Sequence, residues 1–328
     1  MPRGVRINMS IKDFFEKQYR GALLTRRGED PAVKLFSYDE FEELRTEKYD
    51  LESEHGKISG QFYYYDGYDA TRLIVFEHGI AAGHRSYMRE IEKLCSLGYR
   101  IFTYDHIGTG LSGGEYTRGL SGSIADLNFV ISELKKNENI KGLRLAVIGH
   151  SWGGFSSMVI SHFHPDIEHI VAMSGFSSVK RMHRQILPLP LFFMRGQLDK
   201  IERGENPTYV DLDAVDVLKN TKSKVLIIHS RDDKTVNYNI HFKPLVKALK
   251  DKGNIEFLTL DGKDHHPTFT KDAAKYKAEF FKELAKRRKL GELQTLDSQT
   301  EFKNSYDFYK MTVQDDTVFD RIREFLSK

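Results

Sequence analysis

Cysteine, long apolar runs and an excess of charge are what this sequence lacks most clearly. The chain of 328 residues has one cysteine, Cys95, so it cannot form an intrachain disulfide, which suits a reducing compartment. No segment approaches the roughly 18 consecutive apolar residues of a membrane helix. Residues 1–17 have neither an apolar run of about 7 residues nor a small-residue cleavage site. We therefore expect a soluble cytoplasmic protein without a membrane span.

Charge and ligand motifs also limit the function. The 50 Lys and Arg nearly balance the 47 Asp and Glu, which argues against a nucleic-acid surface. The basic cluster Lys286–Lys289 ends a predicted helix and complements its dipole. The chain has no H-E-x-x-H or C-x-x-C spacing and no complete G-x-G-x-x-G after an early strand. We expect no catalytic metal and no cofactor.

Short apolar runs that alternate with amphipathic segments predict an α/β fold. The predicted strands are 72–76, 99–104, 143–148, 169–173, 224–229 and 255–260, and the predicted helices are 124–136, 155–162, 242–250, 272–290 and 317–326. Residues 49–54 and 57–65 alternate apolar and polar around His55-Gly56, which predicts an antiparallel pair at the start. The pattern implies a mostly parallel sheet with helices on both faces and antiparallel N-terminal strands.

Three segments fall outside this alternation. Residues 1–45 form a predicted N-terminal helical arm, with short helices at 11–19 and 38–44, that packs on the domain, covers the site or contacts a second copy. Residues 175–220 lose the core pattern and are interpreted as a small cap or lid insertion, or else as an ordinary packed excursion. The polar residues 291–306 are expected to form a surface loop. The core is then 46–174 and 221–328, and the arm and 291–306 are candidate contacts of a homodimer.

The motif that carries chemistry is Gly149-His-Ser-Trp-Gly153, between a predicted strand and a predicted helix. In this context G-x-S-x-G forms a turn so tight that the serine adopts a strained backbone and small residues are needed two positions on either side. Without such a context the same motif can occur in an ordinary loop that has no catalytic role. The position predicts that Ser151 is an exposed nucleophile.

A serine nucleophile needs an imidazole base, which a carboxylate orients. The predicted strand 224–229 runs into Asp232 and Asp233, and the predicted strand 255–260 runs into His265 and His266. The order Ser, Asp, His, with each residue just after a strand, is that of an α/β-hydrolase triad. Each pair of neighbours offers two candidates, of which only one can reach the serine.

These motifs resemble the α/β-hydrolase family, in particular its esterase, monoacylglycerol-lipase and serine-aminopeptidase-like (S33-type) branch, over about residues 60–270 and the terminal helix. The segment Asp105–Ser112 is similar to the family's D-x-x-G-x-G-x-S turn, with Ile107 where arginine is common. The resemblance implies Asp233 as the acid and His265 as the base. It also implies an oxyanion hole made by the backbone N–H groups of Ile80 and Trp152.

The implied function is a serine hydrolase that cleaves carboxylic esters of small, acyl or aromatic substrates through an acyl-enzyme on Ser151. Amide or peptide hydrolysis, with Glu202 or Glu205 holding a substrate amine, is the main alternative, followed by thioester hydrolysis and acyl transfer. A non-catalytic ligand-binding protein would lack a triad position, and none is missing. The expected substrate contacts are His78, Gly79, His150, Phe192, Phe193 and Met194.

Overall fold

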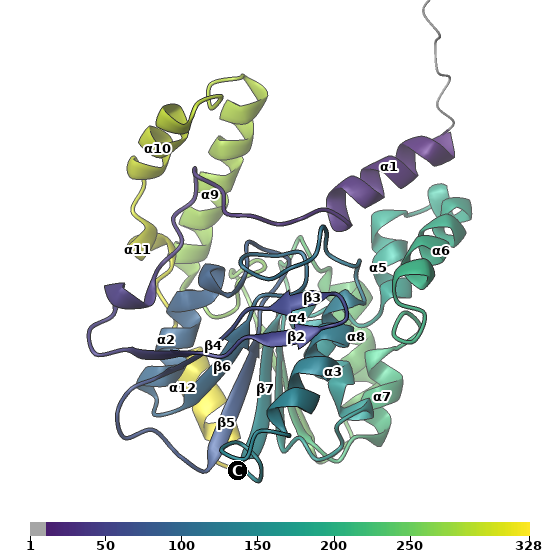
Figure 1. Ribbon diagram of the computed structural model, residues 1–328. Coiled ribbons are helices and arrows are strands. Elements are labelled where there is room, and N and C mark those ends of the chain that lie inside the picture. Colours follow the sequence, from purple (N-terminus) through teal and green to yellow (C-terminus); the bar gives the residue numbers. More distant parts are fainter. Residues whose placement is uncertain (1–10) are drawn as a thin grey trace, which may run out of the picture.

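The computed structural model describes residues 11–328, which are built around an eight-stranded sheet (Figure 1). The strand order is β1-β4-β6-β5-β7-β8-β9-β10. The strands are β1 (Arg45–Lys48), β4 (Gly60–Tyr64), β5 (Arg72–Glu77), β6 (Arg100–Tyr104), β7 (Arg144–His150), β8 (His169–Met173), β9 (Lys224–Ser230) and β10 (Ile255–Leu260). Neighbours from β6 to β10 run parallel, whereas β4 is antiparallel to both β6 and β1. The predicted sheet is confirmed.

A small hairpin precedes the main sheet. Strands β2 (Leu51–Ser53) and β3 (Gly56–Ile58) pair with each other and form a separate two-stranded sheet. The second predicted antiparallel strand, 57–65, is therefore divided, and its later part is β4 of the main sheet. Gly60 permits this change of partner, because a β-carbon there would lie 2.4 Å from the carbonyl oxygen of Tyr49 and 2.6 Å from the Phe102 ring.

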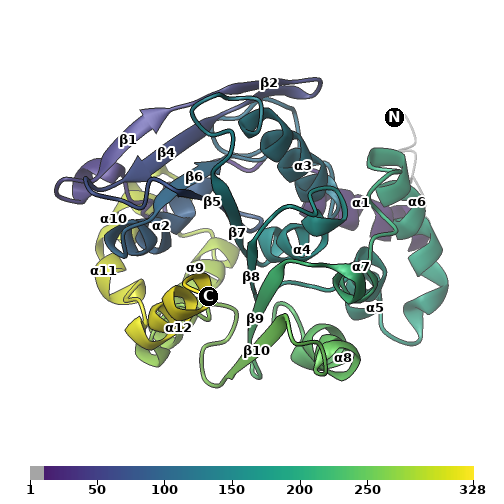
Figure 2. The ribbon, with the colours of Figure 1, turned by 90° about the horizontal axis from the view of Figure 1, so that it is seen from below.

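Helices cover both faces of the sheet because successive residues of its buried strands point to opposite sides. In β5, Leu73 and Val75 belong to one core cluster, and Ile74 and Phe76 belong to the other. The first cluster is covered by α3 (Gly122–Leu134), α4 (Trp152–Val159) and α8 (Tyr238–Leu249), and the second by α2 (Met88–Ser96), α9 (Lys271–Lys289) and α12 (Asp316–Leu326). Figure 2 shows the two layers on either side of the strands.

The segment interpreted as a cap is helical. It contains α5 (Val179–Ile186), the 3₁₀ turn η4 (Leu191–Met194), α6 (Arg195–Glu205) and α7 (Ala214–Asn220). Ala214 and Leu218 are fully buried in the core cluster that α4 shares. Helix α7 is thus the crossover between β8 and β9, so the excursion beyond the core ends before it.

The N-terminal arm packs against this excursion. Helix α1 (Ile11–Leu23) lies beside α6 (Figure 1), and the Tyr19 hydroxyl donates a 2.6 Å hydrogen bond to the carboxylate of Glu202. Glu202 also accepts hydrogen bonds from the N–H groups of Leu120 and Ser121. It is fully buried, so it is not the free carboxylate that an amine-binding role required. Residues 1–10 of the predicted arm lie outside the described residues, and the dimer contact stays a prediction.

Two predicted local structures are wrong. Residues 38–44 contain only the 3₁₀ turn η1 (Tyr38–Glu40), because Phe41 adopts extended backbone. The expected loop 291–306 contains α10 (Leu296–Asn304), which the Thr295 side chain caps and whose Phe302 ring lies 5.4 Å from that of Phe280 in α9. A short helix, α11 (Phe308–Met311), follows and also packs on α9. Aromatic burial therefore orders a segment that looked polar.

None of the helices within residues 11–328 combines the length and the apolar composition that crossing a membrane requires.

Replacement of Glu202 by alanine should lower the free energy of unfolding by about 2–4 kcal/mol, because buried backbone N–H groups would lose their acceptor. Urea unfolding monitored by circular dichroism measures this loss. The matched control is Glu205→Ala on the same helix, whose carboxylate contacts Arg20 and Tyr116 near the surface. The control should change stability by less than about 1 kcal/mol. Equal losses for the two variants would contradict the structural role of Glu202.

Candidate active site

Ser151 occupies the sharp turn between β7 and α4, with φ of 57° and ψ of −111°. The left-handed backbone is enforced by close packing on both sides. A β-carbon at Gly149 would lie 2.1 Å from the carbonyl oxygen of Gly153, and one at Gly153 would lie 2.3 Å from that of Glu77. The Ser151 N–H donates to the carbonyl oxygen of Met173 at 2.8 Å. The turn therefore presents the serine side chain at the end of the sheet.

His265 links the serine to a carboxylate. Its Nε2 lies 2.8 Å from the Ser151 Oγ, and its Nδ1 lies 2.8 Å from the Asp233 Oδ2. The three residues follow β7, β9 and β10, whose carboxyl ends lie at the same edge of the parallel sheet. This geometry lets Nδ1–H donate to Asp233 while Nε2 accepts the serine proton.

Asp233 is held as a carboxylate. It is buried, and its Oδ1 accepts hydrogen bonds from the N–H groups of Thr235 at 2.9 Å and Val236 at 2.8 Å. Burial alone would raise its pKa, but hydrogen bonds from His229 and His265 outweigh burial and hold the pKa well below its usual value. A charged Asp233 can therefore orient His265 and stabilise its protonated form.

The two neighbouring candidates have other contacts. Asp232 accepts hydrogen bonds from the N–H groups of Gly262 at 2.9 Å and Asp264 at 3.2 Å, and so it connects the loops after β9 and β10. The His266 ring packs between His150, at 5.6 Å, and Phe269, at 5.1 Å. The structure thus brings Asp233 and His265, rather than their neighbours, to Ser151.

The backbone N–H groups of Ile80 and Trp152 are the predicted oxyanion donors. Neither group has an acceptor among the described residues, and both residues line the pocket that contains Ser151. Gly79 lets the first of them approach, since a β-carbon there would lie 2.5 Å from the Tyr87 hydroxyl and 3.1 Å from the Ser151 Cβ. Two unused N–H groups near a serine are suited to a developing negative charge.

Tyr87 was not among the predicted site residues, yet it links Gly79 to His150 at the site. The Gly79 N–H donates to the Tyr87 hydroxyl at 3.1 Å, and this hydroxyl donates to the His150 Nδ1 at 2.9 Å. The His150 Nε2–H then donates to the carbonyl oxygen of His265 at 2.6 Å. Burial, followed by the influence of His265, lowers the pKa of His150 to about 3, which keeps the ring neutral for this arrangement. No motif marks Tyr87.

Of the predicted substrate contacts, His150 lines the pocket, but His78 and Gly79 lie behind its wall. The His78 Nε2 accepts from the His106 N–H at 3.1 Å, and its Nδ1 donates to the carbonyl oxygen of Gly79 at 2.6 Å. Burial lowers the pKa of His78 to about 3, so the ring is neutral. His78 therefore supports the turn at Gly79 and Ile80 without lining the pocket.

The predicted cap contacts are placed elsewhere. Phe192 and Phe193 are 55% and 61% exposed, and Met194 is buried in a separate cluster with Tyr19 and Leu198. None of the three predicted cap residues is among the described residues that line the Ser151 pocket. Their placement does not support the predicted contact, because the hydrophobic interior of this segment is used to bind α1.

The pocket above Ser151 has a volume of about 640 Å³. Its walls come from the cap helix α5, from residues 27–36 of the arm, and from α9 and α11. The arm is therefore both packed on the domain and part of the pocket wall. The apolar residues on the cap side are Leu23, Leu120, Phe176, Met182, Ile186 and Val236.

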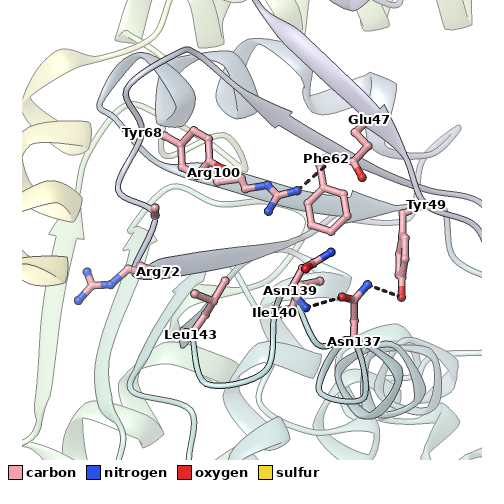
Figure 3. Close-up of a pocket in the computed structure, with 11 residues that line it drawn as sticks. Glu47, Tyr49, Phe62, Tyr68, Arg72, Arg100, Asn137, Asn139, Ile140 and Leu143 are labelled. Carbon is pink, nitrogen blue, oxygen red and sulfur yellow. Dashed lines mark hydrogen bonds and ion pairs between the residues drawn. The ribbon is translucent and has the colours of Figure 1, made fainter.

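A second pocket, of about 360 Å³, lies at the opposite end of the strands, next to Arg72 and Arg100 at the starts of β5 and β6. Figure 3 shows contacts among several of its side chains: Arg100 lies over the Phe62 ring at 4.2 Å and pairs with Glu47 at 3.2 Å, and the Asn137 amide donates to the Tyr49 hydroxyl at 3.1 Å. No serine, cysteine or histidine lines it among the described residues. In residues 11–328, no group of three or more His, Cys, Asp or Glu side chains is arranged to hold a metal ion.

The model of the prolyl oligopeptidase family matches residues 85–288, a range that contains Ser151, Asp233 and His265. The chain belongs to the prolyl oligopeptidase family. It is accordingly an α/β hydrolase of the serine-hydrolase type, as the resemblance implied. The S33-type branch stays a prediction.

Two curated relatives are similar to this prolyl oligopeptidase family member. The uncharacterized protein YqkD of Bacillus subtilis is 25% identical over 211 residues, which is 60% of this chain and 66% of YqkD. The putative carbamate hydrolase RutD of Yersinia enterocolitica is 27% identical over 108 residues, which is 33% of this chain and 37% of RutD. The chain thus spans less than two thirds of the length of either relative.

Solved structures share the fold. The esterase Pf2001 of Pyrococcus furiosus superposes with a TM-score of 0.58 at 18% identity, over 80% of this chain and 97% of the esterase. Est1E of Butyrivibrio proteoclasticus, solved with ferulic acid bound, has a TM-score of 0.55 at 20% identity, over 66% of this chain and 90% of Est1E. At these identities the similarity concerns the fold alone.

In this family member, Asp233→Asn should lower the kcat for an activated ester by about 10³–10⁴-fold, because an amide cannot hold the imidazole in the required tautomer. Steady-state kinetics with 4-nitrophenyl acetate measures the effect. The matched control, Asp232→Asn, keeps a side-chain oxygen acceptor in the loop and should stay within about tenfold of wild type. A larger loss for Asp232→Asn than for Asp233→Asn would reverse the assignment of the acid.

Proposed function

We propose that the protein hydrolyses carboxylic esters through an acyl-enzyme on Ser151. The observation that carries the proposal is the pair of 2.8 Å contacts that join Ser151, His265 and Asp233 at the base of the pocket. Serine is a weak nucleophile at its free pKa, and this arrangement supplies both a base and the group that orients it.

The proposed mechanism begins with attack of the Ser151 Oγ on the ester carbonyl carbon, while the His265 Nε2 removes the hydroxyl proton. The N–H groups of Ile80 and Trp152 stabilise the oxyanion, and Asp233 stabilises the imidazolium. The tetrahedral intermediate collapses when His265 gives its proton to the leaving alcohol. Water, deprotonated by His265, then attacks the acyl-enzyme and releases the acid.

Amide or peptide hydrolysis is the second candidate, favoured by the description of the family as prolyl oligopeptidases. It uses the same triad with a poorer leaving group. The two carboxylates suggested for binding a substrate amine do not line the pocket among the described residues. Glu202 is buried, and Glu205 lies next to Arg20 and Tyr116. These contacts favour ester over aminopeptidase-like chemistry. Thioester hydrolysis and acyl transfer remain alternatives with the same triad.

Ser151→Ala should lower ester turnover by at least about 10³-fold, because no other described side chain near His265 can form the acyl-enzyme. Acyl-chain series of 4-nitrophenyl esters, 4-nitroanilides and thioesters measure the change and the bond preference. A fluorophosphonate probe should label the wild type at Ser151 and leave Ser151→Ala unlabelled. Unfolding in urea should be nearly unchanged in the variant.

Three outcomes would contradict the proposal. Ester turnover by Ser151→Ala above a few per cent of wild type would remove the serine from the mechanism. Faster cleavage of anilides than of matched esters would favour the peptidase alternative. A folded wild-type protein that neither turns over an ester nor reacts with the probe would favour a ligand-binding role.

A further inference from the structure

The wall of the Ser151 pocket opposite the cap carries charged groups that the triad does not use. We call Arg89, Glu90, Lys277, Phe281 and Phe308 the α9 side of the pocket; they come from α2, α9 and α11. Figure 1 shows α9 and α11 on the other side of the molecule from α5 and α6. This side differs from the apolar cap side in having two cations.

Lys277 is unlike other lysines of α9. Lys271, Lys275 and Lys282 are exposed, whereas Lys277 is half-buried and lines the same pocket as Ser151. Its Nζ lies 4.7 Å from the centroid of the Phe269 ring. No carboxylate oxygen within residues 11–328 lies at ion-pairing distance from it. A ring face attracts an ammonium group but does not neutralise its charge.

Arg89 also lies against aromatic rings. Its guanidinium carbon lies 5.7 Å from the centroids of Phe36 and Phe41 and 5.6 Å from that of Tyr309. In the part of the chain that the structure describes, Arg89 also has no carboxylate at ion-pairing distance. By contrast, two other cations that line the pocket are paired. Lys34 contacts Glu40 at 2.6 Å, and Arg85 contacts Glu29.

Glu90 is the acidic group whose charge acts on Lys277, but no ion pair joins the two side chains. Its carboxylate accepts a long, 3.4 Å hydrogen bond from the Thr268 hydroxyl. Burial raises the pKa of Glu90 to about 7, and Lys277 limits the rise. Burial lowers the pKa of Lys277 to about 8, although Glu90 acts in the opposite direction. Near neutral pH, Lys277 is therefore mostly charged while Glu90 is partly protonated.

Lys277 and Arg89 line the pocket and have no carboxylate at ion-pairing distance among the described residues, so an anionic ligand could contact them without displacing an ion pair. We propose that the α9 side of the pocket binds a carboxylate of the substrate, with Lys277 as its main partner and Arg89 as a second cation. The rings of Phe281 and Phe308 would contact the hydrocarbon between this carboxylate and the ester group at Ser151. The inference rests on the proposed function and specifies its substrates as esters that also carry a carboxylate.

Two matched substrate pairs test the charge on either side of the scissile bond. The acyl pair is 4-nitrophenyl hexanoate and mono-4-nitrophenyl adipate, and the leaving-group pair is phenyl acetate and 4-acetoxybenzoate. In wild type, kcat/KM should favour the carboxylate member of at least one pair over its neutral partner, after correction for intrinsic reactivity. Lys277→Gln should reduce that preference about tenfold, since a charge-assisted hydrogen bond is lost and kcat/KM for the carboxylate ester falls more than kcat/KM for its neutral partner.

Three variants control the experiment. Lys275→Gln removes an exposed lysine two residues away on the same helix and should leave the preference unchanged. Lys277→Arg keeps the charge and should restore most of it. Arg89→Gln should reduce it by a smaller factor than Lys277→Gln. An unchanged preference in Lys277→Gln for both pairs, or faster turnover of 4-nitrophenyl 6-aminohexanoate than of the adipate ester, would overturn the inference while the ester hydrolase remains.

A binding measurement keeps the inference testable even if esters are not the substrates. Monomethyl adipate should bind Ser151→Ala protein in calorimetric titration, and the added Lys277→Gln change should weaken binding about tenfold. Absence of binding, or equal binding with and without Lys277, would overturn the anion site. Absence of ester turnover by wild type, together with Lys277-dependent binding, would instead overturn only the proposed function.

Discussion

The close approach of three backbone segments around Ser151 is the constraint on which the site depends. Gly149 packs on Gly153, Gly153 packs on the end of β5, and Gly79 lies against the serine itself. Any side chain at these positions would separate the strand ends. With the segments in contact, the serine keeps its left-handed backbone, and the N–H groups of Ile80 and Trp152 border the same space. The proposed nucleophile and the proposed oxyanion donors are thus placed by backbone packing rather than by flexible side chains.

Buried polar groups beneath and beside the Ser151 turn hold the surrounding segments in place. Glu77 is fully buried below the turn and accepts a 3.0 Å hydrogen bond from Ser156. Burial alone would lower the pKa of the nearby His106, but Glu77 and Asp126 outweigh it and raise the pKa to about 9, so the buried charges compensate one another. Beside the turn, Tyr87 and His150 connect the backbone of Gly79 to the backbone of His265. The site is therefore continuous with the core of the sheet.

The parts that decide access come from outside this core. Residues 27–36 of the N-terminal arm, helix α5 of the cap, and helices α9 and α11 each supply one wall of the pocket. The arm is fixed to the cap by the buried contact between Tyr19 and Glu202. One wall is apolar and the other carries cations that aromatic rings hold. Residues 27–36 and α11 lie outside the range 85–288 that the family model matches, whereas α5 and α9 lie within it.

The sequence by itself determined the sheet, the Ser151 turn and the chain order of the triad, because these depend on local patterns: apolar runs, glycine spacing and polar residues just after strands. It did not reveal Tyr87, the burial of Glu202, the helix α10 or the outward placement of Phe192 and Phe193. Only the tertiary structure decided these, since each depends on partners far away in the chain, such as Tyr19 for Glu202 and Phe280 for Phe302. The choice of Asp233 over Asp232 depended partly on the sequence and partly on the tertiary structure. A family motif implied it, and the direction of each carboxylate in the folded loop gave it a physical reason.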